Sequence, residues 1–435
     1  MHSLHSEFRT GIQGHLKVES MSASYSNHFF KGERAASSHL HTVIFAIQKL
    51  RMDELRVKLD DIANPFSINY GKHMSKVQIS EMTSNREGSA ALVRFLESHW
   101  HHSSEKVQIL KMAQTEDFIA ARASVKLWEI FFNTEFYQFH SKKATRSMKN
   151  GYKSFVLFCI VYLIKIVIFV VMLGPFIRSM EYSLPIEIAA HVLGVFNVSD
   201  VPFPPQSRAK ISTNKPTESE LAAAWEALAS SSYSPSSEAT IVPNFVTPAL
   251  LNQVYNITNN TGSLLVSQGI YETGEEWYSP ADLTSFQSLM GLPQEAVAVD
   301  IGGHQDDNAC DIGDCYEGNL DTQYLMAISQ FTPTTYYYID EDNFILDWLI
   351  AVSAMSAPPL VMSVSWELPD HLISATHLTA VNNQAMILSA MGVTLIAASG
   401  DNGAHDNTGS CEYSTDFPAS SPFFTAVGAT DVIPN

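Results

Sequence analysis

The sequence is 435 residues long, more than one ordinary domain, and its apolar fraction of 46% is that of a globular protein. Its formal net charge of −19 is unevenly divided, because residues 1–210 carry 25 Lys and Arg against 18 Asp and Glu, whereas residues 211–435 carry only Lys215 against 27 acids. Phosphates would repel the acidic half, so a nucleic-acid partner is excluded.

The surplus of carboxylates in the second half predicts a protein that works in an acidic compartment. Carboxylates repel one another at neutral pH and destabilise the compact form, and the repulsion fades near their pKa of roughly 4. The first half holds 12 of the 16 His, and we expect it to bind the acidic half near neutrality and to loosen on acidification. The alternative is that the acidity only aids solubility.

Three local features bear on the compartment. Cys310 and Cys315 are close enough in sequence to form a small disulfide loop. Glycosylation triplets, which favour a secretory route, begin at Asn197, Asn256 and Asn259. Residues 1–38 are polar and lack the apolar stretch of a signal peptide, so they are expected to form a leader with no clear targeting signal.

Residues 39–200 predict a small α+β module. The segment 41–47 alternates as a strand does, and 52–62 and 88–99 have helical spacing on either side of the turn-rich stretch 64–74. Strands and helices that follow one another over this length are typical of one small α+β domain.

A hydrophobic segment interrupts this module at Phe155–Leu173. Its 19 residues, broken only by Lys165, are long enough to span a membrane, but a span here would place two parts of one small domain on opposite sides of the bilayer. The triplet Arg146-Ser147-Met148 recurs as Arg178-Ser179-Met180, so removing residues 149–180 leaves a continuous module. We therefore expect an unspliced intron or a gene-prediction error, with a real membrane anchor as the alternative.

Residues 201–244 are rich in Pro, Ser and Ala and predict a linker or processing region. From residue 245 to residue 435, apolar strands alternate with helical stretches, which indicates a parallel sheet covered on both faces. The expected strands are Ala296–Ile301, Thr334–Ile339, Leu360–Ser365, Val393–Ala398 and Phe423–Gly428, and the expected helices are Asp321–Ser329, Phe344–Met355 and Leu372–Met391.

The strand Val393–Ala398 breaks at Ser399-Gly400-Asp401, and a further short strand is expected at Phe417–Pro422. A strand that stops at Gly beside an acid is typical of the edge of an α/β active site, because such sites gather at the carboxyl ends of parallel strands. The alternative is a surface turn in which Gly and Asp serve only local hydrogen bonds.

These segments resemble the sedolisin family of serine-carboxyl peptidases (peptidase S53). The stretches ASGDNGA (398–404) and FPASSPFFTAVGAT (417–430) resemble its SGDxGA and FPASSPYVTxVGGT motifs. Residues 41–75, with Pro65-x-Ser67-x-x-Tyr70-Gly71, resemble its activation domain, and Thr247–Leu251 with Tyr255–Ile257 resembles the start of its mature enzyme. The resemblance covers residues 39–140 and 181–435.

The resemblance implies an α/β fold: a subtilisin-like parallel sheet with flanking helices, here incomplete, preceded by an α+β ferredoxin-like activation (pro) domain. It also implies that the prodomain is an intramolecular inhibitor that blocks the cleft until acid-triggered cleavage. Family precursors are cut in a linker of this kind, which places maturation near Arg208 and Lys210.

The segment Cys315–Met326 resembles the family's Glu-x-x-x-Asp helix, in which spacing i, i+4 puts two carboxylates on one face. By resemblance Glu317 is the general base, Asp321 orients it, and Asp401 lies in the oxyanion hole. A carboxylate suits acid because imidazole is protonated there and cannot accept a proton. Taken alone, a Glu-x-x-x-Asp pair most often lies on the solvent-exposed surface of a helix and has no catalytic role.

The family's nucleophile lies in a Gly-Thr-Ser-x-Ser motif, which does not occur in these 435 residues. Ser399, Ser420 and Ser421 belong to the motifs already placed and are not replacements. The chain as written is therefore expected to be inactive and C-terminally incomplete. The calcium of the complete family enzyme is expected to bind beyond Asn435, so neither a metal nor a cofactor site is assigned in this chain.

Other polar clusters have simpler interpretations. The acids at 306, 307, 311 and 314 lack the Gly and Glu of a calcium loop and are expected to be a solvated loop. The His at 304, 371, 377 and 405 have no zinc spacing. Tyr336–Tyr338 is expected to lie in a strand core or a cleft wall.

The sequence thus predicts the precursor of an acid-acting serine-type peptidase, a tripeptidyl-peptidase or an endopeptidase, whose substrates are peptides or proteins. The alternative is a non-catalytic binding or inhibitory remnant of such a peptidase. The expected location is a lysosome or vacuole, or the extracellular space, with anchoring through 155–173 as the alternative. The choice between exo- and endopeptidase action, the specificity and the oligomeric state stay open.

Overall fold

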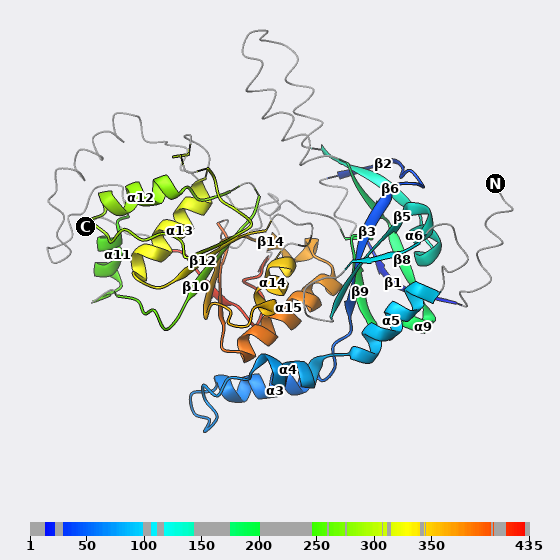
Figure 1. Cartoon of the computed structure of the whole chain (residues 1–435), viewed down its shortest axis with the longest axis horizontal. Coiled ribbons are helices and arrows are strands. Elements are labelled where there is room, and N and C mark those ends of the chain that lie inside the picture. Colours follow the sequence, from blue (N-terminus) through cyan, green and yellow to red (C-terminus); the bar gives the residue numbers. More distant parts are fainter. Residues whose placement is uncertain are drawn as a thin grey trace, which may run out of the picture. The chain divides into compact units, whose positions relative to one another are not determined.

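A computed structural model describes residues 14–21, 29–98, 106–110, 117–142, 175–200, 246–258, 261–274, 276–306, 308–310, 315–339, 343, 345–401, 403 and 415–430. The chain divides into two compact units. Unit 1 draws its described residues from 1–58, 75–202 and 371–383, and unit 2 from 59–74, 203–370 and 384–435 (Figure 1).

Unit 1 contains a four-stranded antiparallel sheet in the order β4-β5-β3-β9. The chain passes through it as strand, helices, two strands, helix and strand. The elements of this path are β3 (Leu40–Ile47), α3 (Met52–Ala63, which continues into unit 2), α4 (Lys76–Thr83), α5 (Arg86–Ser98), β4 (Gln108–Leu110), β5 (Phe118–Ser124), α6 (Val125–Phe132) and β9 (Val192–Phe196). The predicted strand at 41–47 and the predicted helices at 52–62 and 88–99 are confirmed.

The core of unit 1 is a cluster of aromatic side chains. Phe45, Trp128, Phe131 and Phe132 are fully buried, and Phe132 lies at their centre with its ring 4.8 Å from Phe131 and 5.5 Å from Trp128. The indole N–H of Trp128 donates to the carbonyl of His41 at 2.9 Å, so the polar atom of the cluster is satisfied. This cluster fastens α6 to β3.

Two smaller sheets complete unit 1 and correct two predicted boundaries. β1 (His15–Ser20) pairs with β8 (Glu181–Pro185), which leads into the short helix α9 (Ile186–Ala189). β2 (Phe29–Arg34), β6 (Phe136–Ser141) and β7 (Phe176–Ser179) form a three-stranded sheet. The prediction of a leader over 1–38 is therefore wrong for β1 and β2, and the predicted insert 149–180 extends too far, because it includes β7.

The physical reason for the missed strands is their charge. Strand β2 carries Lys31 and Arg34, and their cationic groups lie over the ring of Tyr137 at 3.3 and 5.5 Å from its centroid. Charged residues on short strands hide them from a search for apolar alternation.

No helix among the described residues is long and apolar enough to cross a membrane. The segment Phe155–Leu173 and the linker 201–244 lie outside the described residues. The interpretations given to them therefore stay predictions.

Unit 2 is built on a six-stranded sheet in the order β11-β12-β10-β13-β15-β17, with every pair parallel. The predicted α/β fold, a parallel sheet with flanking helices, is confirmed. The strands are β10 (Gln268–Glu272), β11 (Val299–Ile301), β12 (Thr334–Tyr338), β13 (Val361–Val364), β15 (Thr394–Ala398) and β17 (Thr425–Val427). The helices are α11 (Pro248–Val254), α12 (Pro280–Leu289), α13 (Tyr316–Ile328), α14 (Leu346–Ala354) and the second part of α15 (Ala375–Ala390), whose residues 375–383 belong to unit 1.

Helices cover both faces of this sheet, because alternate side chains of the central strands point to opposite faces and contact different helices. Ile270 and Tyr336 pack with Met326 of α13 on one face. On the other face Tyr271 stacks on Trp348 of α14, with ring centroids 5.0 Å apart. Figure 1 shows α12 and α13 on one side of β10 and β12, and α14 on the other. Tyr336 and Tyr337 are fully buried, as predicted for a strand core.

The predicted strand at Phe417–Pro422 is wrong. Only β16 (Asp416–Phe417) is extended; it pairs with β14 (Leu368–Pro369), and a turn follows as far as the start of β17. Pro418 and Pro422 have no backbone N–H to donate to a ladder, which is why the apolar run does not become a strand.

The aromatic core of unit 1 yields a stability prediction. Replacing Phe132 by Ala removes a fully buried ring from the cluster and should lower the free energy of unfolding by about 3–5 kcal/mol. Denaturant unfolding followed by tryptophan fluorescence measures the change. Phe66→Ala, at a side chain that is 97% exposed, is the matched control and should have no measurable effect. A loss for Phe132→Ala no larger than that of the control would contradict this account of the core.

Candidate active site

Helix α13 carries two of the three residues singled out by the sequence, Glu317 and Asp321, one turn apart. Glu317 is buried and Asp321 partly buried. Gly318 lies between these two acids in α13. There is no room for a larger side chain at this position, because a β-carbon on Gly318 would lie 2.4 Å from the carbonyl carbon of Trp277. The backbone of residues 277–278 thus presses against the first turn of α13 and fixes the position of Glu317.

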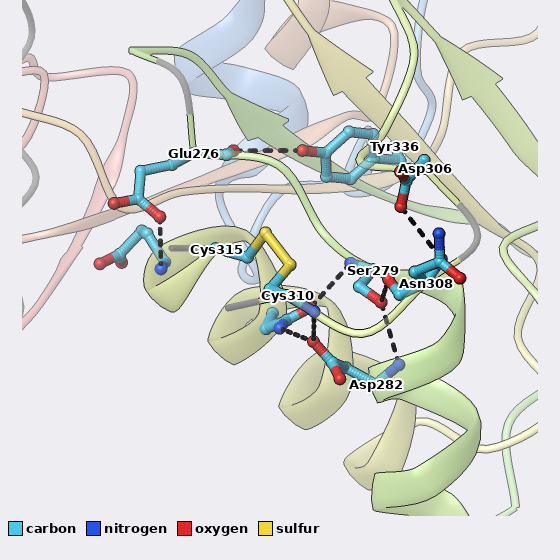
Figure 2. The surroundings of a disulfide bond; sticks show 10 residues. Glu276, Ser279, Asp282, Asp306, Asn308, Cys310, Cys315 and Tyr336 are labelled. Atoms are coloured by element: carbon cyan, nitrogen blue, oxygen red, sulfur yellow. Dashed lines mark hydrogen bonds between the residues drawn. A yellow bond between two sulfur atoms is a disulfide. The ribbon is translucent and has the colours of Figure 1, made fainter. Parts of the chain in front are cut away.

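A disulfide joins Cys310 to Cys315, the residue before α13, as the sequence suggested. The carboxylate of Asp282 on α12 accepts the backbone N–H of Cys310 at 3.0 Å and the side-chain amide of Asn319 at 2.9 Å. Asn319 in turn accepts the backbone N–H of Ser279, the N-cap of α12, at 2.8 Å. Figure 2 shows this arrangement, which ties the start of α13 to the start of α12.

Glu276 completes the support of the first turn of α13. Its carboxylate accepts the backbone N–H of Glu317 at 3.1 Å, and its carbonyl accepts the hydroxyl of Tyr336 at 3.3 Å (Figure 2). An acid at this end of a helix is favourable because the free N–H groups there carry partial positive charge. The helix therefore begins at a fixed point above β12.

Glu272, the last residue of β10, is a site residue that sequence reasoning missed. It is completely buried, and Trp366 donates its indole N–H to the carboxyl at 2.9 Å. Asp321 lies beside it and accepts the hydroxyl of Ser365 at 2.7 Å. The sequence did contain a signal, because Glu272 ends a strand just before Thr273-Gly274, as Asp401 follows a strand at Gly400.

These buried acids keep protons beyond the usual pH range. Burial raises the pKa of Glu272 well above its ordinary value, and the charges of Asp321 and Glu317 raise it further, while the hydrogen bond from Trp366 opposes the rise. Burial also raises the pKa of Asp321 to about 6, against hydrogen bonds from Ser365 and Glu272 that lower it. The cluster can therefore exchange protons in weakly acidic solution.

Asp401 lies in the turn after β15, with its side chain exposed. Its backbone N–H donates to the carboxyl of Glu367, a second residue that the sequence analysis missed. Three consecutive residues after β13 thus each contact one acidic residue. Ser365 contacts Asp321, Trp366 contacts Glu272, and Glu367 contacts Asp401.

The structure brings the predicted residues to one edge of the sheet. Strands β10, β13 and β15 are neighbours, and their carboxyl ends are followed by Thr273-Gly274, Ser365–Glu367 and Ser399–Asp401. Glu317 and Asp321 join this edge from α13, next to Glu272, whereas Asp401 joins it through its backbone contact with Glu367. The arrangement can take up a proton at the α13 acids and presents a further carboxyl two strands away.

The other polar clusters give no built site. His304 pairs with Asp300, and within the described ranges no group of three or more His, Cys, Asp or Glu is placed to hold a metal ion. Asp307, Asp311, Asp314 and His405 lie outside the described residues, so the interpretation of that loop stays a prediction.

Comparison with known proteins found sequence similarity to one protein family and to several curated proteins. Residues 27–201 match the family described as "Pro-kumamolisin, activation domain". Tripeptidyl-peptidase 1 of Bos taurus and of Homo sapiens are each 32% identical to the chain over 197 residues, and that of Mus musculus is 33% identical. Each match covers 42% of this chain and 34% of the relative, so the aligned part spans about a third of the curated relatives' length.

Among solved structures, the similarity is weak. Pseudomonas sedolisin, a serine-carboxyl proteinase complexed with two molecules of pseudo-iodotyrostatin, aligns with a TM-score of 0.33 at 21% identity. The alignment covers 42% of this chain and 52% of that one. The epidermin leader peptide processing serine protease of Staphylococcus aureus aligns with a TM-score of 0.37 at 10% identity, over 90% of this chain and 71% of that one. Similarity at this level carries no argument about the site.

The raised pKa values predict a stability that depends on pH. A carboxyl whose pKa is raised by folding stabilises the fold fully in acid and loses that contribution as the pH rises through the folded pKa. For Asp321 the loss should run from about pH 4 to above pH 6, and it amounts to roughly 1.4 kcal/mol for each pH unit by which the folded pKa exceeds the unfolded one. The free energy of unfolding should therefore fall between about pH 4 and pH 6 because of Asp321, and the raised pKa of Glu272 should extend the fall to higher pH.

The variant Glu272→Gln isolates the contribution of the buried cluster. Its amide keeps the contacts with Trp366 and Asp321 but has no proton to lose, so the fall in stability above pH 5 should be clearly smaller than in the wild type. Thermal and denaturant unfolding at each pH give the measurement, with Glu54→Gln on the exposed face of α3 as the control. Equal pH dependence in the wild type and in Glu272→Gln would refute the assignment.

Proposed function

We propose that this chain, which is similar to the Pro-kumamolisin activation domain over residues 27–201 and to tripeptidyl-peptidase 1, belongs to the sedolisin family of serine-carboxyl peptidases and is the zymogen of an acid-acting peptidase. Unit 1 is the activation domain, and unit 2 is the part of the catalytic domain that supplies the acidic residues. The substrates are peptides or proteins, cleaved by tripeptidyl-peptidase or endopeptidase action.

One observation carries the proposal: Glu317 and Asp321 lie on one buried helical face beside Glu272, at the carboxyl edge of a parallel sheet. Sites of α/β proteins form at this edge. Carboxyl groups titrate in acid, so a carboxylate can still accept a proton at a pH at which a histidine base would already be charged.

In the proposed reaction a serine hydroxyl attacks the peptide carbonyl and passes its proton to the carboxylate of Glu317. Asp321 orients that carboxyl and stabilises the proton that it takes up, and the buried Glu272 contacts the carboxyl of Asp321. The carboxyl O–H of Asp401 donates a hydrogen bond to the oxyanion of the tetrahedral intermediate. The serine belongs to the family's Gly-Thr-Ser-x-Ser motif, which is not among residues 1–435.

The finer details of the fold are part of the proposal. The strand order β9-β3-β5-β4 along a strand–helix–strand–strand–helix–strand path supports a ferredoxin-like activation domain. The parallel sheet with helices on both faces supports a subtilisin-like catalytic domain. Calcium, which the family resemblance implies, finds no ligand set in the described part of the chain, and no step is assigned to it here.

The proposed regulation follows from charge. Residues 1–210 are basic and residues 211–435 strongly acidic, which supports a prodomain that inhibits the catalytic part near neutrality and is released in acid. Cleavage would occur in the linker, near Arg208 and Lys210, inside a lysosome, a vacuole or an acidic extracellular space. A non-catalytic binding or inhibitory protein is the second candidate, because these 435 residues lack the serine motif.

The deciding experiment uses the product of the full-length transcript. Sequencing the mature messages shows whether residues 149–180 are retained and whether an open frame beyond codon 435 encodes the Gly-Thr-Ser-x-Ser motif. The encoded protein is then assayed at about pH 4 with peptides whose amino terminus is free or blocked. Cleavage of only the free form indicates a tripeptidyl-peptidase, and cleavage of both indicates an endopeptidase.

The roles of the acids predict specific losses. Glu317→Gln and Asp321→Asn should each lower kcat/KM by about 10²–10⁴, because each removes a group that takes up or supports the transferred proton. Glu295→Gln, which changes an acid whose carboxyl accepts the backbone N–H of Phe331, should retain full activity. A stop at codon 435 in every message, or full activity in Glu317→Gln, would favour the non-catalytic candidate or another mechanism.

A further inference from the structure

Two carboxyl groups that the proposed reaction does not use, those of Glu367 and Asp416, meet against the backbone of Gly400. A β-carbon on Gly400 would lie 2.5 Å from Oε2 of Glu367 and 2.8 Å from Oδ2 of Asp416. Each of these acids is only 7% exposed. Two acidic side chains therefore share one small, largely buried space beside the turn that carries Asp401.

Backbone pairing holds the two acids together. Glu367 directly precedes β14, and Asp416 is the first residue of β16. These strands pair antiparallel with Pro369 opposite Asp416. The hydroxyls of Thr415 and Ser420 also donate to the carboxylate of Asp370, at 2.6 and 2.8 Å, and so tie both sides of β16 to the residue after β14. The acids cannot separate unless this paired segment opens.

The pair is connected to the proposed oxyanion residue through the main chain. The backbone N–H of Asp401 donates to the carboxyl of Glu367. Gly400, the residue before it, has a φ of +90°, a conformation that glycine adopts readily and that other residues avoid. The turn at Gly400–Asp401 is thus shaped by a glycine and held by the Glu367 carboxyl.

The charges around the pair are acidic. Asp401 and Asp416 are the charges that act on Glu367, and Asp370 and His371 follow it on the same segment. The sequence has no Lys or Arg after Lys215, so no such cation from residues 216–435 can neutralise a second negative charge. Burial raises the pKa of Glu367 to about 7, and the charges of Asp416 and Asp401 contribute to the rise.

We propose that Glu367 and Asp416 share one proton, and that this proton holds the Gly400–Asp401 turn in place, which makes Glu367 a positioning residue that confines the site to acid. The inference rests on the proposed function of Asp401. Above neutrality Glu367 releases its proton to water and the two carboxylates repel each other. Their separation moves the Glu367 carboxyl away from the backbone N–H of Asp401, and the Gly400–Asp401 turn loses that contact.

Hydrogen exchange of the turn tests the proposal without any catalytic readout. Exchange of the full chain is followed by mass spectrometry in peptides that cover residues 394–403, at about pH 5.5 and about pH 8, with rates corrected for the intrinsic effect of pH. Above a pKa near 7, the protonated fraction of Glu367 falls about tenfold for each pH unit, and the protection that depends on this proton falls with it. Protection of these peptides should therefore fall about tenfold between the two pH values.

Glu367→Gln should abolish this fall. The glutamine amide can accept the N–H of Asp401 and donate to Asp416, and it has no proton to lose, so the turn should stay protected at both pH values. Asp416→Asn provides the same test from the other partner if Glu367→Gln does not fold. Glu295→Gln is the matched control, because burial also raises the pKa of Glu295 and it too accepts a backbone N–H, but from Phe331.

The outcomes separate this inference from the proposed function. Equal protection of 394–403 at both pH values in the wild type, or an undiminished tenfold fall in Glu367→Gln and Asp416→Asn, overturns the shared proton even if the full-length protein is an active peptidase. If it is active, Glu367→Gln should also raise the ratio of kcat/KM at about pH 7 to that at about pH 4.5 by about tenfold. An unchanged ratio overturns the positioning role.

Discussion

The carboxyl edge of the sheet in unit 2 depends on protons that buried acids retain. Glu272 is completely enclosed, Asp321 lies against it, and Glu317 is close enough for its charge to act on Glu272. Three ionised carboxylates in this space would repel one another strongly, because a buried charge without a cation is costly. Retained protons, together with the donors Trp366 and Ser365, make the cluster stable.

The same constraint explains how the surrounding elements are built. Helix α13 is fixed at its start by the Cys310–Cys315 disulfide, by Asp282 and by the close contact at Gly318, so its two acids have little freedom to move apart. The segment 365–367 then links these acids to the turn of Asp401. These contacts hold several acidic groups close together. The arrangement is stable only at acidic pH, where some of the groups stay protonated and do not repel one another.

Much of this architecture could be predicted from the sequence. The β-branched runs of β13 and β15 and the i, i+4 spacing of Glu317 and Asp321 are local patterns, and local patterns identified the sheet and the helix. Strand β10 was missed because its polar ends, Gln268 and Glu272, hide a fully buried segment. The contacts of Trp366 and Glu367 were beyond sequence reasoning, since they join residues about 94 and 34 positions apart that meet only when the sheet has formed.

The most direct test of this account is the protonation of Glu272 itself. Carbon-13 labelling of the Glu side-chain carboxyls allows each group to be titrated by NMR in the full chain. The account predicts that the Glu resonance missing from Glu272→Gln keeps its protonated position well above the ordinary pKa of a glutamate, separately from the resonance missing from Glu367→Gln. If the resonance assigned to Glu272 instead titrates near pH 4, like an exposed glutamate, the edge is not held by buried protons and the acid-dependent site is contradicted.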